Sequence, residues 1–253
     1  MQILRLWWES LGAWIRLELG NGGRWLYRKY AQTLLKTVAT AGGLAARIAP
    51  GQRNKGRIVR LSARVLLRLL GRKVSFKDGG LIEIGRPSVL MANRAGLFDA
   101  LVLTAVLPVP VRFADSGALD FLPGVVAFLL RPIVLPALHD VPIPPGGTLR
   151  QRIRRGLEEG ISIVVLSEGP PTVPAHLSRF RLDALDAAVQ TSSPIYPLGV
   201  QGTSSILSLG RKMFGSGEAS ITVGVPVVTQ INDARDLVVL REQVRDAIAK
   251  LCS

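Results

Sequence analysis

Two patterns of hydrophobic and polar positions follow one another along the chain. From about residue 80, short apolar runs bounded by Gly and Pro alternate with segments whose apolar residues recur every three or four positions. The short runs predict strands and the periodic segments predict helices. The predicted strands are 88–92, 110–114, 132–135, 161–166, 195–200 and 219–225, and the predicted helices are 97–107, 118–130, 148–158, 179–190 and 233–251. This alternation favours an α/β fold with a mixed, mostly parallel sheet flanked by helices.

The earlier part of the chain has a helical period throughout and many basic residues. Residues 1–20 carry several Trp and Leu side chains among few charges, as in a helix that lies at a membrane interface. In residues 24–50 the predicted apolar face is Tyr27, Tyr30, Leu34, Val38, Ala41, Ala45 and Ile48. The "FKDGG" stretch at 76–80 predicts a linker. We therefore expect basic amphipathic helices over 1–77 and an α/β domain over 78–253.

The charge of the chain is concentrated in the first of these regions. Residues 1–77 contain 16 Lys and Arg but two Asp and Glu, whereas residues 78–253 contain 16 of each, so the whole net charge of +14 lies in the first part. Such a region fits a polyanion, either an anionic membrane surface or a nucleic acid. A third interpretation is that the helices pack on the core and expose an ordinary solvated face of Arg60, Arg64 and Arg68. No RNA-binding aromatic motif, zinc spacing or helix-turn-helix pattern accompanies the charge, so nucleic acid is not the expected partner.

Hydropathy, the signal-peptide pattern and the cysteine content bear on the cellular location of the protein. No uncharged apolar run reaches the roughly 18 residues of a membrane-spanning helix, and Arg131 interrupts the most apolar stretch, 121–138. Charged residues also interrupt the apolar stretch that a secretory signal peptide requires near the start. Cys252 is the single cysteine, so no disulfide within the chain is expected. These features predict a peripheral or monotopic protein on the cytoplasmic face of a membrane, not a secreted one.

Candidate chemistry begins in "MANRAGLFDA", residues 91–100, at a junction between a predicted strand and a predicted helix. Loops that follow strands in α/β folds commonly carry catalytic and binding groups. This loop contains Asn93, Arg94 and Asp99. A second stretch, "VVLSEGPPT", places Glu168 and Gly169 directly after another predicted strand.

With the segments 123–135 and "SPIYPLGVQGT" (193–203), these stretches resemble, in order and spacing, the motifs of the glycerophospholipid acyltransferases of the lysophosphatidic acid acyltransferase type. The resemblance spans roughly residues 60–250. The positions that match the family's motifs are Asn93, Asp99, Glu168, Gly169, Pro194, Ile195 and Pro197. The resemblance implies transfer of a fatty acyl group from acyl-CoA or acyl carrier protein to the hydroxyl of a lysophospholipid, with no metal and no tightly held cofactor.

The sequence departs from the family at positions that carry its chemistry. Arg94 stands where the family has the His that removes a proton from the acceptor hydroxyl. A guanidinium stays protonated at neutral pH and has no acceptor lone pair, so Arg94 cannot act as that base. Pro171 occupies the place of an Arg that would bind the substrate phosphate. Arg131 lies close to, but out of phase with, the basic residue of the second motif.

Several roles are therefore open for these residues. Each of His139 and His176 is expected to be an ordinary surface histidine, and the two are also the alternative bases that the chain offers. Arg94 either forms a salt bridge with Asp99 that keeps the loop folded, or binds a phosphate near the start of the following helix. Glu168 either contacts glycerol hydroxyls or caps its loop.

The expected site thus comprises Asn93, Arg94 and Asp99 in the catalytic position and Glu168, Gly169 and Arg131 against substrate. Residues 121–138 are the candidate wall of an acyl-chain tunnel. Two alternatives remain beside acyl transfer: a catalytically inactive acyltransferase-like protein that binds lipid or a partner at the membrane, and a nucleic-acid-binding module in the basic region.

Overall fold

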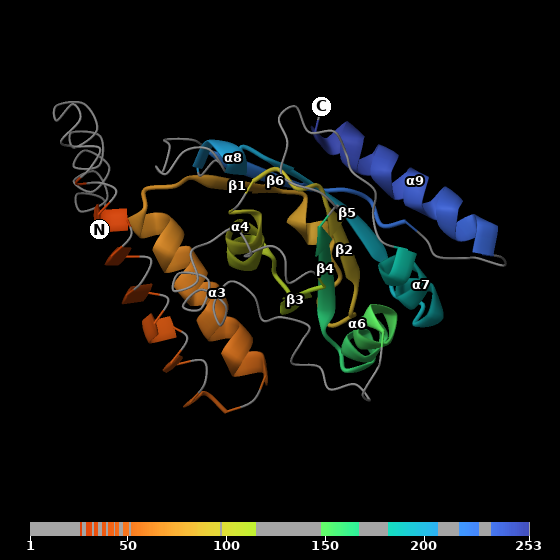
Figure 1. The fold of residues 1–253 in the computed structure, drawn as a ribbon, viewed down its shortest axis with the longest axis horizontal. Coiled ribbons are helices and arrows are strands. Elements are labelled where there is room, and N and C mark those ends of the chain that lie inside the picture. The colour runs from red at the N-terminus through yellow and green to blue at the C-terminus, as the bar shows by residue number, and fades with distance from the viewer. Residues whose placement is uncertain are drawn as a thin grey trace.

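A computed structural model describes residues 26, 29–31, 33–34, 37–38, 40–42, 44–45, 48–50, 52–96, 98–114, 148–166, 182–206, 218–227 and 234–252. Its centre is a six-stranded sheet with the order β1-β6-β5-β2-β4-β3 (Figure 1). The strands are β1 (Val74–Lys77), β2 (Val89–Ala92), β3 (Val111–Phe113), β4 (Ser162–Leu166), β5 (Ile195–Gln201) and β6 (Ala219–Val223).

The sheet is mixed and mostly parallel. Strands β5, β2, β4 and β3 run in one direction, whereas β6 pairs antiparallel with β5 and carries β1 parallel to itself. The central strands β2 and β4 are buried at every position, as expected for parallel strands that are covered on both faces. This confirms the predicted α/β architecture.

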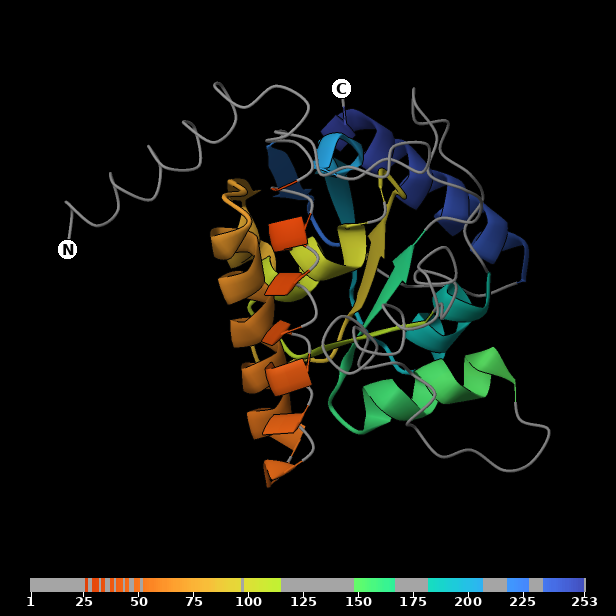
Figure 2. The same ribbon diagram turned by 60° about the vertical axis from the view of Figure 1, so that its left-hand side comes forward.

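Helices cover both faces of the sheet (Figures 1 and 2). Alternate residues of the strands point to opposite sides, so Leu90 and Val164 join one hydrophobic cluster while Met91 and Ile163 join the other. The first cluster contains side chains of α3 (Gln52–Leu69) and α4 (Asp99–Val106), and the second contains side chains of α6 (Leu149–Glu158), α7 (Leu182–Gln190) and α9 (Ala234–Cys252). Two short helices, η1 (Gly79–Leu81) and α8 (Thr203–Ile206), follow β1 and β5.

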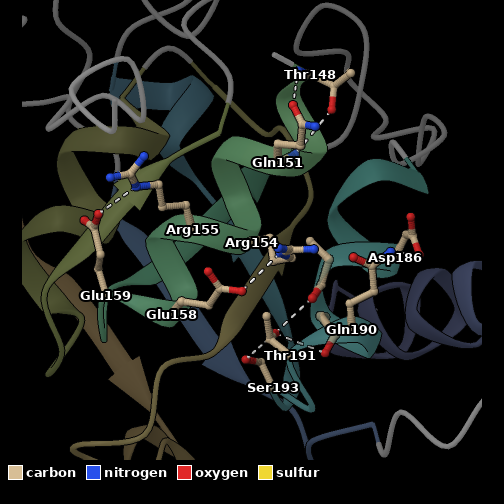
Figure 3. A network of polar contacts seen from close by, with 12 residues as sticks. Thr148, Gln151, Arg154, Arg155, Glu158, Glu159, Asp186, Gln190, Thr191 and Ser193 are labelled. Carbon is tan, nitrogen blue, oxygen red and sulfur yellow. Dashed lines mark hydrogen bonds and ion pairs between the residues drawn. The ribbon is translucent and has the colours of Figure 1, made fainter. Parts of the chain in front are cut away.

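The contact between α6 and α7 is polar on its outer side (Figure 3). Thr148 and Gln151 form a reciprocal capping box at the start of α6. Arg150 binds Asp186 of α7 at 2.7 Å. The other ion pairs of α6 join residues four apart, Arg154–Glu158 and Arg155–Glu159. These exposed pairs contribute little each, and they account for Arg150, Arg154 and Arg155 without a ligand.

The described positions between Leu26 and Ile48 are helical and lie beside α3 (Figures 1 and 2). Tyr30 Oη donates to the carbonyl of Leu69, at the far end of α3, so the two segments run antiparallel. Leu34 and Val38 pack on the core as predicted. The predicted apolar face is only partly buried, because Ala45 is exposed and Ile48 is 75% exposed.

Helix α3 confirms the predicted amphipathic helix, but its arginines are not all directed to solvent. Arg60 donates to the carbonyl of Pro108 at 3.1 Å, and Arg64 donates to that of Ala105 at 2.7 Å. Both acceptors lie at or just past the last turn of α4, where carbonyls lack helical partners. Two arginines of the predicted stripe therefore hold α3 against α4.

The linker predicted at 76–80 is wrong. Phe76 and Lys77 belong to β1, and residues 79–81 form η1. The short run 74–77 has too few residues for its alternation to stand out, and it becomes a strand because β6 pairs with it. The predicted helix 118–130 and strand 132–135 lie outside the described residues.

Candidate functional site

The loop that holds the sequence-predicted residues lies where the parallel strands β2 and β4 end, beside β5. Ala92, the last residue of β2, is in register with Leu166 of β4 and Leu198 of β5. The loop from Asn93 to Phe98 leaves β2 there and leads into α4. Crevices beyond the carboxyl ends of parallel strands are the usual ligand sites of open α/β sheets.

Asn93 ties the start of this loop to β5. Its amide nitrogen donates to the carbonyl of Val200 at 2.8 Å, and its amide oxygen accepts from the N–H of Val200 at 2.7 Å. The side chain is 2% exposed. Asn93 therefore extends the pairing of β2 with β5 by one side chain, and its amide positions the loop.

Asp99 closes the loop from its other end. One carboxylate oxygen, Oδ2, accepts from the N–H groups of Ala95 at 2.8 Å and Gly96 at 2.9 Å. The other oxygen, Oδ1, accepts from the hydroxyl of Thr203. The residue is 1% exposed, so its carboxylate is directed to the protein's own donors.

Burial and hydrogen bonding act in opposite directions on the pKa of Asp99. Removal from water raises the pKa of Asp99 to about 6, whereas the hydrogen bonds from Gly96, Thr203 and Ala95 and the positive charge of Arg94 act in the opposite direction. At neutral pH the carboxyl is ionised, and the carboxylate holds the loop through the hydrogen bonds that it accepts from Ala95, Gly96 and Thr203.

Gly96 allows the loop to lie directly on the segment that follows β5. A Cβ at this position would lie 2.6 Å from backbone atoms of both Thr203 and Ser204, which leaves no room for any other residue. Thr203, which is fully buried, thereby reaches Asp99 across 104 residues of sequence. Sequence reasoning assigned no role to Thr203, because only the pairing of β5 with β2 brings it here; its place at the end of the fourth motif segment was the available signal.

Arg94 is half-buried within this loop, one residue before the two amides that bind Asp99. Its charge acts on the Asp99 carboxyl. A guanidinium donates hydrogen bonds and binds anions but does not accept a proton at neutral pH. The described part of the site can thus hold an anion, and it contains no group placed to act as a general base.

The structure brings one further arginine to the same edge of the sheet. Arg72 is 7% exposed and lies between α3 and β1. The carbonyl of its neighbour Lys73 accepts from the N–H of Ala219, the first residue of β6, which begins where β5 ends. No local pattern distinguishes Arg72 from the other basic residues of the first region, so sequence reasoning did not single it out.

The remaining predicted site residues, Glu168, Gly169, Arg131, His139 and His176, lie outside the described residues. The strand before Glu168 does end at Leu166, beside Ala92. Across the part of the chain that the structure covers, no three Asp, Glu, His or Cys side chains gather as a metal site would require.

No family model and no curated protein sequence matches this chain. Among solved structures, the fold is similar to the crystal structure of the 1-acyl-sn-glycerophosphate (LPA) acyltransferase PlsC from Thermotoga maritima, with a TM-score of 0.65 and 18% sequence identity. The match covers 89% of this chain and 92% of that one. The chain therefore has the mixed, mostly parallel α/β fold of a lysophosphatidic acid acyltransferase.

Proposed function

We propose that this chain acts on lysophospholipid-type lipids at a membrane surface, as a protein of the glycerolipid acyltransferase type. The observation that supports this best is the loop from Asn93 to Asp99. It matches the first acyltransferase motif at both ends, and buried hydrogen bonds hold it at the carboxyl end of β2 in a fold shared with an LPA acyltransferase.

The reaction proposed is transfer of an acyl group from acyl-CoA or acyl carrier protein to a lysophospholipid hydroxyl. The hydroxyl oxygen attacks the thioester carbonyl, so that a C–O bond forms and the C–S bond breaks. The hydroxyl proton passes to a base, and the departing thiolate finally takes up a proton. No metal or tightly held cofactor takes part.

The base for this reaction must come from elsewhere in the chain. Arg94 cannot accept the proton, and the Asp99 carboxylate is buried behind three donors. His139 and His176 are the candidates on sequence grounds, while Arg94 is assigned to the phosphate of the acceptor lipid.

A second candidate function is lipid binding without transfer. It is favoured by two departures from the family's motifs, Arg94 at the position of the base and Pro171 at the position of the phosphate-binding Arg. In this version the Arg94 guanidinium holds the phosphate of a lysolipid, and the fold serves as a lipid carrier or regulator.

Acyl transfer by the purified full-length chain separates the two functions. Labelled acyl-CoA and acyl carrier protein donors are tested with a panel of lysophospholipids. Turnover that is lost in His139→Gln or in His176→Gln supports transfer with a relocated base. No turnover with any donor, together with retained lysophospholipid binding, supports the binding function, and the absence of both turnover and binding contradicts the proposal.

The phosphate assignment is tested by comparing lysophosphatidic acid with monoacylglycerol, which lacks the phosphate. Arg94→Gln should weaken binding of the first lipid at least tenfold and leave the second unchanged, because one charge-assisted contact is worth about 1.5 to 3 kcal/mol. Arg86→Gln is the matched control, since Arg86 is half-exposed and lies before β2, at the opposite end of that strand. Equal losses for both lipids would contradict the assignment.

We further propose that the basic helices dock on an anionic membrane surface, which places the protein on the cytoplasmic face as a peripheral or monotopic protein. Described positions on one side of the segment 26–48 are exposed and carry apolar or small side chains: Leu26, Tyr30, Thr33, Thr37, Ala41, Leu44 and Ile48. Arg57 and Arg68 are exposed on the adjoining α3. Among the described helices, none has both the length and the apolar character needed to cross a bilayer. Vesicle binding tests this docking.

A further inference from the structure

We propose that Leu251, in the last turn of α9, is a positioning residue for the loop from Asn93 to Asp99, and that it acts through the end of β5. The proposal rests on the proposed function, because this is the loop to which lipid binding is assigned. It connects the loop with a helix on the other face of the sheet, since α4 and α9 contribute to different hydrophobic clusters.

Leu251 occupies space that two glycines leave open. A Cβ at Gly199 of β5 would lie 2.6 Å from the Cβ of Leu251 and 2.9 Å from its carbonyl oxygen. A Cβ at Gly224, just after β6, would lie 3.1 Å from the Cδ1 of Leu251. Neither glycine has a positive φ, so close approach, and not backbone conformation, accounts for glycine at both positions. The end of α9 therefore packs directly on β5 and on the residue that follows β6.

A polar contact fixes the same turn of α9 to β5. The side-chain Nε2 of Gln201 donates to the carbonyl of Cys252 at 2.6 Å. The last carbonyls of a helix have no partner within the helix, and this bond satisfies one of them. Gly199 and Gln201 thus both contact the end of α9, and they lie on either side of Val200 in the strand.

Val200 connects this contact to the site. The backbone pairing of β2 with β5 ends where Ala92 is in register with Leu198. Beyond that register, the Asn93 side chain binds both the N–H and the carbonyl of Val200. The bonds that hold the start of the loop are therefore made by the residue between the two on which α9 rests.

The other edge of this stretch of β5 does not act independently of α9. It pairs with β6, and β6 leads into Gly224, on which Leu251 also rests. Loss of the Leu251 side chain would therefore loosen both strands beside Val200. The same stretch leads into Thr203, whose hydroxyl binds Asp99 at the end of the loop. In this way α9 supports both ends of the loop from the far face of the sheet.

Native-state hydrogen exchange of the full-length chain tests the proposal. The N–H groups of Val200, Ala95 and Gly96 donate to the side chains at the two ends of the loop, so their exchange reports on those bonds. In Leu251→Ala these three amides should exchange about tenfold faster or more, relative to the amides of the buried strand β4. Leu251→Met fills the same space and should restore the exchange of the natural chain.

Val244→Ala is the matched control, because Val244 is fully buried on the same helix. It should destabilise the whole fold and should change the three loop amides no more than those of β4. If Leu251→Ala does not fold, Gln201→Met takes its place, since it removes the donor to Cys252 at an exposed position. Loop amides that respond to these changes no more than to Val244→Ala would overturn the proposal.

Lipid binding is measured separately, with lysophosphatidic acid as the probe. Leu251→Ala should bind this lipid several-fold more weakly than Val244→Ala, because the loop carries Arg94. If the loop amides respond as expected while the natural chain binds no lipid, the positioning role stands and the proposed function fails. Lipid binding by the natural chain, together with loop amides that do not respond, would support the function and overturn the positioning role.

Discussion

Asn93 and Asp99 are polar side chains inside a hydrophobic cluster, and the partners of both are built into the fold. Val200 satisfies the Asn93 amide through its N–H and its carbonyl. Two loop amides and Thr203 satisfy Asp99. A buried polar group without such partners would cost several kcal/mol. These two residues would therefore be required for folding even in a chain that performs no transfer.

The raised pKa of Asp99 predicts a pH dependence of stability. Its pKa is about 6 in the folded chain, against about 3.9 for an unfolded aspartate, so the folded chain binds this proton more tightly. The stability contributed by this difference is complete below pH about 4, falls as pH rises to about 6 by on the order of 3 kcal/mol, and is constant above.

Asp99→Asn provides the comparison. Its amide oxygen can accept from Ala95 and Gly96 while its amide nitrogen donates to Thr203, whose hydroxyl can also accept. The difference in unfolding free energy between the natural chain and the variant, measured by urea denaturation with circular dichroism, should decrease between pH 4 and 6. A difference that stays constant or increases with pH would show that the Asp99 pKa is not raised.

At the scale of elements, the loop after β2 depends on its fit against α8. Gly96→Ala would push a methyl group into the backbone of Thr203 and Ser204, which cannot rotate away. We expect a loss of about 1 to 3 kcal/mol, the usual cost of overpacking. Gly80→Ala is the control, because nothing lies within 4 Å of its added Cβ. Similar unfolding free energies for the two variants, measured by urea denaturation, would contradict this packing.

Arg60 and Arg64 act at the contact of α3 with α4. Their bonds to Pro108 and Ala105 satisfy carbonyls at the end of α4. Burial and the neighbouring charges of Arg64 and Arg57 lower the pKa of Arg60. The hydrogen bonds to α4 therefore hold Arg60 and Arg64 in place against the repulsion between neighbouring arginines. The double change Arg60→Gln and Arg64→Gln should reduce the unfolding free energy by about 1 to 2 kcal/mol.

The matched control for this contact is the double change Arg57→Gln and Arg68→Gln on the same helix. Both of these side chains are exposed, so stability should change by less than about 0.5 kcal/mol. Thermal denaturation of the two double variants in one buffer makes the comparison. Equal losses would mean that the carbonyl contacts do not stabilise the helix pair.

At the scale of the whole molecule, the exposed apolar positions of segment 26–48 lie beside helix α3, which carries the exposed Arg57 and Arg68 (Figures 1 and 2). We expect the chain to float with anionic phosphatidylglycerol vesicles, to float poorly with neutral phosphatidylcholine vesicles, and to be released as salt rises. The double change Leu44→Gln and Ile48→Gln should reduce vesicle binding several-fold, because two exposed apolar side chains lose their contact with lipid.

Val238→Gln and Val239→Gln on α9 serve as the control for this measurement. These side chains are also exposed, but they belong to the helix on the opposite face of the sheet, so vesicle binding should not change. Flotation that is insensitive to Leu44 and Ile48, or tight salt-dependent binding of RNA in preference to vesicles, would contradict membrane docking.

The amino-acid sequence determined the elements whose signals are local. Strands β2 to β6 and helices α3, α4, α6, α7 and α9 follow from runs and periods within a few residues, and the loop at 93–99 was identifiable from its position between a strand and a helix. The sequence also showed that Arg94 is not a base, since that depends on the side chain alone.

Only the tertiary structure decided the relations between distant segments. Strand β1 exists because β6 pairs with it, and the roles of Val200, Thr203 and Arg64 depend on neighbours that lie 41 to 107 residues away in the chain. The burial that raises the pKa of Asp99 is likewise a property of the assembled core. Pairing, burial and hydrogen bonding across such separations are fixed by which surfaces meet in space, and no periodicity along the chain encodes them.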